Sequence, residues 1–512
     1  MYTFVKQVFH LLFPVGFQLP SRYINALFMK KRILTLCFRG IAVASLAMLA
    51  NCTSQPEPVV KDKADYVPDN LPPDALCLVK PSWFPHSQTP APAEGTGSPF
   101  DVSETTNEIF HQWSWNKFLW LTKPNAAGTP LFLDPAQAKQ VTTYMDVVQI
   151  PAGVQVVLQD FNQAGSTSPI LRTNPGYSDK GISETVFYSI HMDPKMYGAG
   201  VDFGTQLVTG KLPATNEAVF PVGSFELKVA WVPITAIPVA KQAAYYITTA
   251  SLSRDGGKTF ANQKVALIGM HVVGVVENHP EFIWATFEHD DLSPDYDWTA
   301  NAVSSTVDQL LFKKGSGSGI DGIRFNTATQ LGYTPYQVFD LFKYGVPRDN
   351  TGAFMTTSQS GQVNFDNVDG INTCVKAKLD DVWKNYFYNG SIWLNTDGTT
   401  PQQQAQLINN LGPNIGSATP GSSARGSLNC ANVTMESFTQ TFTSTITDIN
   451  VNNLANCFSC HRATKFGDSK TVSPLYLSHT FQDYLLRRNG TSVPKIENLK
   501  TKDEDRVRMM LK

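Results

Sequence analysis

Two cysteines and a histidine near the C-terminus of this 512-residue chain have side chains and a spacing suited to chemistry. Cys457 and Cys460 are separated by two residues, and His461 follows the second cysteine directly. This is the spacing by which a c-type haem is attached, because each thiol can form a thioether with one vinyl group of the porphyrin. The adjacent imidazole then binds the iron as an axial ligand. The pattern predicts one covalently attached haem c, with His461 as an iron ligand.

Other chemistry is open to the same residues. Three thiolates and one imidazole make an acceptable tetrahedral zinc site, and the chain offers Cys430, Cys457, Cys460 and His461. Zinc sites of this kind usually contain two closely spaced cysteine pairs, and the second pair is missing here. A thioredoxin-like dithiol would follow a strand, whereas the sequence before Cys457 is rich in Asn, which is typical of a loop. Haem is therefore the preferred interpretation, with zinc or a plain disulfide as the alternatives.

The sequence offers several candidates for the second axial ligand of the haem iron. His479 lies 18 residues after His461 and is the only later histidine. Ligation by two histidines would lower the reduction potential relative to ligation by histidine and methionine. We expect His479 to be the sixth ligand of the iron. The alternatives are an open or water-occupied position, or one of the methionines Met435, Met509 and Met510.

Haem is attached in this way outside the cytoplasm, and the N-terminal sequence has the pattern of an export signal. Residues 29–32 form a basic segment, with Met29 as the better start of translation, and residues 41–50 form a short apolar run that ends in small side chains. An apolar run of this length is too short to span a bilayer. An uncleaved membrane anchor over residues 33–50 is the alternative.

The end of this signal region, residues 1–52, resembles a bacterial lipobox. The sequence Leu-Ala-Asn-Cys ends at Cys52, which is therefore the predicted lipidation site and first residue of the mature protein. No Asp follows Cys52, and this resembles sorting to the outer membrane rather than to the inner one. We expect a periplasmic protein that is lipid-anchored to the outer membrane.

Charge excludes one class of partner and favours another. Residues 1–51 hold six basic and no acidic side chains, so the remaining 35 basic and 43 acidic residues give a formal charge of −8. This balance is not that of a nucleic-acid-binding protein. Residues 461–512 are different, with 11 Lys or Arg and six Asp or Glu. Such a basic segment beside a haem would attract an acidic redox protein partner, the alternative being an ordinary solvated surface.

Three further cysteines, Cys77, Cys374 and Cys430, are left outside the motif and the signal region. The periplasm permits disulfides, although connectivity cannot be read from spacing. We favour a bond between Cys374 and Cys430, because it would close the loop-like segment between them.

The fold class predicted from the pattern of residues is α+β. A β-rich, sandwich-like or barrel-like domain is expected first, and a small all-α haem domain follows it. The predicted order is a Pro- and Ser-rich tether at 53–100, the β-rich domain at 101–300, a mixed region with a long loop at 301–430, and the haem domain at 431–512. The clearest strands are predicted at 154–158, 225–231, 244–248, 265–276 and 282–287.

Helices are predicted outside these strands by apolar residues three or four apart. One begins at Ile109 and carries Trp113 and Trp120 as core residues, and another covers residues 375–387. In the β-rich region, His271 lies in an apolar strand and His289 stands at a strand end beside acidic residues. Metal binding or acid–base chemistry is conceivable for both, but a structural role is the preferred interpretation.

Residues 431–512 resemble the cytochrome c superfamily in the motif of Cys457, Cys460 and His461 and in the helices predicted on either side of it. The whole chain resembles a group of bacterial exported lipoproteins with a large β-rich N-terminal region. In that group a Trp-rich segment like 113–118, a β segment like 283–289 and a C-terminal haem motif occur together. These resemblances imply a haem cofactor and an exported location, without naming a substrate.

The function expected from these observations is electron transfer through one haem. An electron carrier is therefore favoured over an enzyme. The alternative is a haem-containing oxidoreductase whose β-rich domain binds a substrate, and a third possibility is a binding module with a structural or gas-sensing haem. The chain contains no dinucleotide fingerprint, phosphate-binding loop or nucleophile elbow.

Overall fold

The computed structural model describes residues 79–103, 108–159, 171–209, 217–294, 305–315, 361–411, 424–426, 432–436, 457–461 and 473–488. All of them belong to one compact unit, Pro68–Lys512. The predicted signal region with Cys52, most of the predicted tether, and Cys77, Cys430, Met509 and Met510 lie outside the described residues. Within the described part of the chain, no helix has the length and apolar character needed to span a bilayer.

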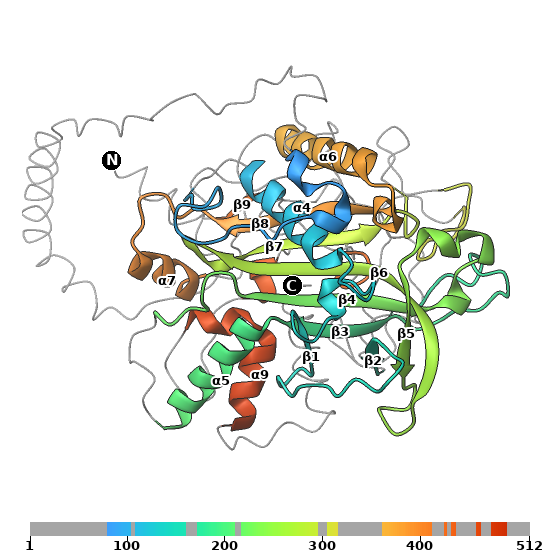
Figure 1. Cartoon of the computed structure of the whole chain (residues 1–512), viewed down its shortest axis with the longest axis horizontal. Coiled ribbons are helices and arrows are strands. Elements are labelled where there is room, and N and C mark those ends of the chain that lie inside the picture. Colours follow the sequence, from blue (N-terminus) through green and yellow to red (C-terminus); the bar gives the residue numbers. More distant parts are fainter. Residues whose placement is uncertain are drawn as a thin grey trace, which may run out of the picture. The chain divides into compact units, whose positions relative to one another are not determined.

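A nine-stranded sheet forms the centre of this unit (Figure 1). Seven strands follow the order β1-β3-β4-β6-β7-β8-β9, while β5 pairs with β6 and β2 pairs with β5. Every pairing is antiparallel except that of β2 with β5. The strands are β1 Lys139–Val141, β2 Val156–Leu158, β3 Phe187–Met192, β4 Phe225–Pro233, β5 Ile247–Leu252, β6 Ala261–Val276, β7 His279–His289, β8 Tyr386–Leu394 and β9 Ala424–Gly426.

The predicted α+β class with a β-rich part is confirmed, since β1 to β7 all fall within residues 139–289. One expectation is corrected: the described strands form a single open sheet, with β1 and β9 at its ends, rather than a sandwich or a barrel. The reason is that helices and irregular segments, not a second sheet, cover the apolar faces. The separate all-α haem domain expected at the C-terminus is not seen in the described residues, which pack directly on the sheet.

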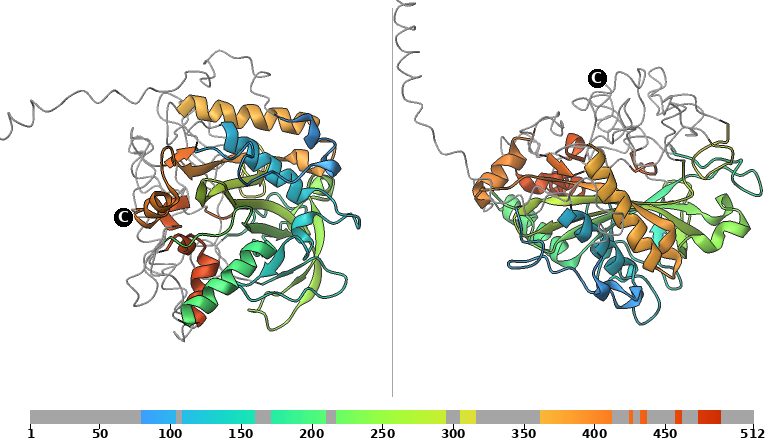
Figure 2. Two further views of the ribbon diagram at one scale, coloured as in Figure 1. Left: turned by 60° about the vertical axis from the view of Figure 1, so that its left-hand side comes forward. Right: turned by 90° about the horizontal axis from the view of Figure 1, so that it is seen from above.

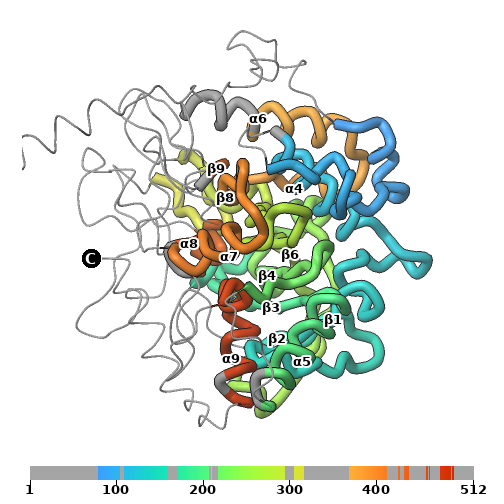
Figure 3. Tube along the Cα trace, turned by 90° about the vertical axis from the view of Figure 1, so that its left-hand side faces the viewer, coloured from blue at the N-terminus to red at the C-terminus, as the bar shows by residue number. Residues whose placement is uncertain are grey.

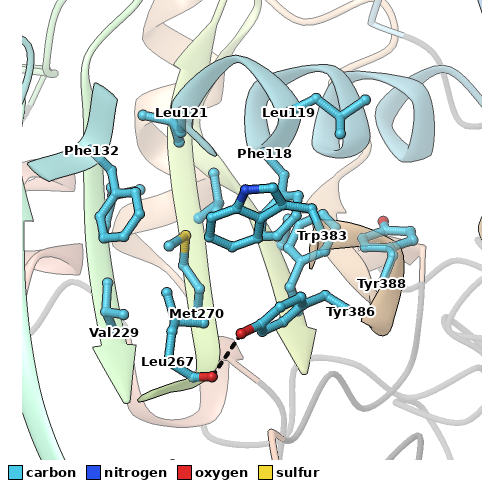
Figure 4. Close-up of a cluster of buried hydrophobic side chains, with 14 of the residues drawn as sticks. Phe118, Leu119, Leu121, Phe132, Val229, Leu267, Met270, Trp383, Tyr386 and Tyr388 are labelled. Atoms are coloured by element: carbon cyan, nitrogen blue, oxygen red, sulfur yellow. Dashed lines mark hydrogen bonds between the residues drawn. The ribbon is translucent and has the colours of Figure 1, made fainter. Parts of the chain in front are cut away.

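One face of the sheet is covered by α4 (Glu108–Thr122) and α6 (Gly361–Lys378), which lie side by side (Figure 2). Trp113 is fully buried there and Trp120 is partly buried, as expected of core residues. The Tyr386 hydroxyl donates a hydrogen bond of 2.8 Å to the Leu267 carbonyl oxygen within this core (Figure 4). Around it pack Phe118, Leu119, Leu121, Phe132, Val229, Met270, Trp383 and Tyr388.

The opposite face carries a second apolar cluster, into which the C-terminal segments pack. Side chains alternate between the two faces along β6, so that Val272 belongs to the first cluster and Val273 to the second. Helices α5 (Pro194–Val208) and α9 (His479–Arg488) lie beside each other on this second face (Figure 3). Helix α7 (Pro401–Asn409) and the single turn α8 (Cys457–Cys460) contribute to the same cluster.

Candidate functional site

The cysteine motif forms the single helical turn α8. The His461 amide donates a hydrogen bond of 2.8 Å to the Cys457 carbonyl oxygen and so closes the turn. Phe458 is fully buried in the second cluster, with its ring centroid 6.1 Å from that of Trp284 on β7. Cys457 is partly buried against the same cluster. The apolar residue between the two cysteines therefore anchors the motif on the sheet, while the Cys460 side chain lies outside the described residues.

His461 is held in a defined tautomer. Its Nδ1 atom lies 2.8 Å from the carbonyl oxygen of Leu477. A carbonyl oxygen only accepts hydrogen bonds, so Nδ1 carries the proton and Nε2 is the basic nitrogen of the neutral ring. Histidines that bind a metal commonly have this arrangement, with the other ring nitrogen donating to a backbone carbonyl. The donor chemistry of His461 therefore fits an iron ligand.

His479, the first residue of α9, lies against His461. The two ring centroids are 4.0 Å apart and the ring planes differ by 17°. The structure thus brings together the two histidines that were predicted as axial ligands. Metal–imidazole bonds are about 2 Å long, and two ligands on opposite sides of one metal must direct their nitrogens towards each other. Face-to-face stacking is not that geometry, so binding one iron requires at least one ring to turn.

Local sequence explains why α9 begins at His479. The Ser478 hydroxyl accepts a hydrogen bond of 3.1 Å from the Phe481 amide, which is the usual role of a serine that caps a helix. Phe481 and Leu485, four residues apart on the helix, are both buried in the second cluster. The short 3-10 turn Pro474–Leu477 precedes the cap, and all four of its residues are buried. The segment before the histidine is therefore fixed by apolar contacts on the sheet.

A carboxylate that the sequence pattern did not single out lies next to this helix start. Glu226 on β4 accepts hydrogen bonds from the Ser478 hydroxyl (2.7 Å) and from the Thr480 hydroxyl (2.8 Å). Burial raises the pKa of Glu226, while these two hydrogen bonds and the nearby charge of Lys228 act in the opposite direction. The one sequence signal was a pair of charged residues, Glu226 and Lys228, alternating with buried apolar residues in this strand.

Met435, the described methionine among the alternative ligands, lies elsewhere on the sheet. It is fully buried in a third cluster with Val433 and Tyr188, whereas Phe458 and the 475–485 segment belong to the second. The Tyr188 hydroxyl donates a hydrogen bond of 2.5 Å to the neighbouring Thr434 carbonyl oxygen and helps to hold this segment. Among the described candidates, His479 is therefore the one that contacts His461.

His271 and His289 have partners of other kinds. In His289, Nδ1 accepts from the Asp291 amide at 3.1 Å and Nε2 donates to the Ala244 carbonyl oxygen at 3.0 Å. His271 pairs through Nε2 with the Glu436 carboxylate at 2.8 Å. Within the described ranges, no three His, Cys, Asp or Glu side chains lie close enough to hold a metal ion. These contacts agree with a structural role for both histidines.

A second cluster of polar side chains, around Tyr177 and Asp291, was not predicted from the sequence either. The Tyr177 hydroxyl lies 2.5 Å from the Asp291 carboxylate and 2.9 Å from the Tyr245 hydroxyl, and Lys241 donates to the same carboxylate at 2.8 Å. Burial and the hydrogen bond to Asp291 raise the pKa of Tyr177 far above its usual value. The phenol therefore stays protonated, which makes it a hydrogen-bond donor and not an activated base.

Cys374 on α6 is disulfide-bonded. Its expected partner, Cys430, and the remaining candidate, Cys77, both lie outside the described residues. The pairing of Cys374 with Cys430 therefore stays a prediction.

Comparison with known proteins finds no matching family model, no matching curated protein and no matching solved structure. Function has to be inferred from the Cys457–His461 motif and from the geometry around it.

Proposed function

We propose that this protein is an exported c-type cytochrome that transfers electrons through one covalent haem c. Cys457 and Cys460 would form the thioethers, His461 would be the proximal ligand, and His479 would be the sixth. The observation that carries the proposal is the hydrogen bond of 2.8 Å from Nδ1 of His461 to the Leu477 carbonyl oxygen, which orients the histidine of the cysteine turn and makes Nε2 its basic nitrogen. The haem would supply one-electron chemistry at this site.

The surrounding residues have roles that suit such a site. The Leu477 carbonyl oxygen, by accepting from Nδ1 of His461, orients the imidazole and makes Nε2 a stronger donor. Trp284 lies with its ring centroid 4.4 Å from that of His461 and is almost fully buried, so it shields one side of the imidazole from water. Shielding and axial-ligand identity are two of the means by which a protein sets a haem potential.

Electron transfer is favoured over substrate chemistry by the presence of two histidines at the site. An iron with ligands on both axial positions has no vacant position for a substrate. In the polar group around Tyr177 and Asp291 the phenol of Tyr177 stays protonated, so this tyrosine adds no support for an oxidoreductase. A haem-containing oxidoreductase therefore stays the second candidate function, and the experiment below distinguishes it from an electron carrier.

The proposal is tested on the full chain produced in a host that matures c-type haem. We expect a protein mass increased by one haem, a pyridine haemochrome spectrum of a c-type haem, and low-spin spectra in both oxidation states. The double variant Cys457→Ala/Cys460→Ala should lose the covalent haem, whereas the matched variant His271→Gln, on the same face of the sheet, should keep it. An unmodified wild-type mass would contradict the proposal, and a high-spin haem that binds carbon monoxide would favour the oxidoreductase or a gas-binding module.

The same proposal includes location and partner. The N-terminal pattern supports export, lipidation at Cys52 and an outer-membrane anchor, and the basic residues after His461 support an acidic redox partner. The resemblance of residues 431–512 to cytochrome c supports a helical haem-binding unit in that part of the chain. Metabolic labelling with palmitate should mark the wild type but not Cys52→Ser, and labelled Cys52→Ser would exclude this anchor.

A further inference from the structure

The sheet is incompletely paired where β2 lies beside β1 and β3. β2 pairs with β5 on one edge, and an isolated bridge between Gln159 and Tyr188 joins the end of β2 to β3. The Gln140 side chain takes the place of a neighbouring strand: it accepts from the Val157 amide at 3.0 Å and donates to the Val157 carbonyl oxygen at 2.6 Å. A cavity of about 50 Å³ lies at this position, and Lys228 of β4 is among its lining residues.

The wall of the cavity contributed by β1 and the turn after it is held in shape by local hydrogen bonds. The Thr142 hydroxyl accepts from the Tyr144 and Asp146 amides, each at 3.2 Å. A pocket that is largely pre-formed loses little free energy to rearrangement when a ligand enters. The apolar residues that line it are Val141, Val148, Val157 and Ile190.

Lys228 gives the cavity a positive charge. Its neighbours Leu227 and Val229 are buried in the first cluster, so Lys228 stands on the opposite face of the sheet. Among the described lining residues Lys228 is the charged one, and none of them is acidic. Tyr188 also lines the cavity, but burial raises the pKa of its phenol well above the ordinary value, so it stays neutral.

The carboxylates around the cavity are bound to other groups. Glu226, which interacts electrostatically with Lys228, accepts hydrogen bonds from two hydroxyl groups at the start of α9. The other two pairs are Glu436 with His271 and Asp146 with Arg487. The charges of these carboxylates are therefore partly compensated, which favours an anion beside the ammonium group of Lys228.

The volume limits the size of a ligand. A single water needs about 10–15 Å³ of such space, so the cavity holds about four waters or an organic molecule of about five non-hydrogen atoms. A molecule that also matches the lining has one charged end for Lys228 and one apolar end for the valines and Ile190. Bonds between an ammonium group and a carboxylate are among the stronger hydrogen bonds, and burial of an alkyl group is favourable.

We propose that this cavity binds a short aliphatic monocarboxylate of the size of propionate, with its carboxylate at Lys228 and its alkyl group on the apolar wall. The described residues of the Cys457–His461 motif do not line the cavity. The inference is therefore independent of the haem, and either can fail without the other.

The test is a ligand-observed NMR titration of the full-length protein with propionate and with the neutral analogue propionamide, at constant ionic strength. We expect propionate to bind in the millimolar range, because so few atoms limit the affinity, and propionamide to bind at least tenfold more weakly. Lys228→Met should weaken propionate binding at least tenfold. The matched control is Lys139→Met on β1. Its ammonium group lies 6.0 Å from the Tyr197 ring centroid, it does not line the cavity, and its loss should leave binding unchanged.

A second variant covers a Lys228→Met protein that does not fold. Val148→Phe fills the cavity from the turn, keeps the charge of Lys228 and should abolish propionate binding. Wild-type protein that does not bind propionate would overturn the inference. Unchanged binding in folded Lys228→Met or Val148→Phe, or equal binding of propionamide, would overturn it as well. Sulfate that binds more tightly than propionate would show a site for inorganic anions instead.

Discussion

The carbonyl oxygen of Leu477 accepts a hydrogen bond of 2.8 Å from Nδ1 of His461, across 16 residues of chain. One residue beyond the Ser478 cap, the His479 ring stacks on the His461 ring. The segment that orients His461, the proposed proximal ligand, therefore also carries His479, the ligand proposed for the sixth position. A shift of this segment would move both imidazoles, whereas replacement of the His479 side chain alone keeps the Leu477 carbonyl oxygen that orients His461.

Replacement of His479 by Ala should leave the haem attached and open its sixth position. The thioethers and His461 are untouched, so the pyridine haemochrome yield should match that of the wild type, while the ferric spectrum should become high-spin and the ferrous protein should bind carbon monoxide. The control His271→Gln should remain low-spin. A low-spin His479→Ala protein would show that another side chain is the ligand.

Replacement of Trp284 by Leu should weaken both the fold and the shielding of His461. Trp284 is almost fully buried and contacts Phe282, Phe458 and His461. We expect the free energy of unfolding to fall by about 2–4 kcal/mol in denaturant titrations. The reduction potential should fall as well, because greater access of water stabilises the ferric charge. An unchanged potential would indicate that Trp284 does not border the haem.

Acidification should destabilise the protein partly through His191. Burial lowers the pKa of His191 from 6.5 to about 3, so the unfolded state binds a proton that the folded state does not. This group therefore stabilises the fold fully above pH 6.5 and loses that contribution as the pH falls towards 3, by up to about 1.4 kcal/mol per pH unit.

The measurement for His191 compares two slopes. Denaturant unfolding of wild type and His191→Gln between pH 7.5 and 4.5 should show a shallower pH dependence in the variant, whatever its absolute stability. Equal slopes would mean that the imidazole is protonated in the folded protein or that it is not buried.

The disulfide at Cys374 should be detectable as a linked peptide. We expect a digest without reductant to join the Cys374 and Cys430 peptides, and Cys374→Ser to lower the free energy of unfolding by about 2–4 kcal/mol. A link from Cys374 to Cys77 would contradict the predicted pairing without affecting the haem site.

The β-rich part of the fold was predictable from sequence because runs of β-branched and aromatic residues mark strands. The predicted strands 265–276 and 282–287 lie within β6 and β7. The predicted helix 375–387 was wrong: α6 ends at Lys378, and residues from Tyr386 onwards pair with β7. Helical spacing of apolar side chains there was overridden by pairing with a strand about 100 residues earlier.

The part of the predicted mixed region 301–430 that is rich in Gln, Gly and Ser also contains a helix. Helix α7 begins after Thr400, whose hydroxyl accepts from the Gln403 amide while the Gln403 side chain accepts from the Thr400 amide. This capping box is a short-range signal that the Gln-rich composition concealed.

The sequence alone pointed to the two histidines that the structure places in contact, because the motif spacing and the scarcity of later histidines can be read along the chain. The partners Glu226 and Trp284 could not be named in advance. They reach the motif from β4 and β7, about 180 to 250 residues away in the chain. Only the pairing of the sheet brings them there, and no local pattern encodes that pairing.

The dependence of the motif on distant strands has a consequence for how the site can be used. Phe458 and His461 rest on Trp284, and the cap of α9 is bound to Glu226. A fragment of residues 431–512 would lack both of these contacts. We therefore expect that the isolated fragment does not hold His461 and His479 in their native positions. If the proposed haem is present, the sheet is part of its binding site and not merely a support for it.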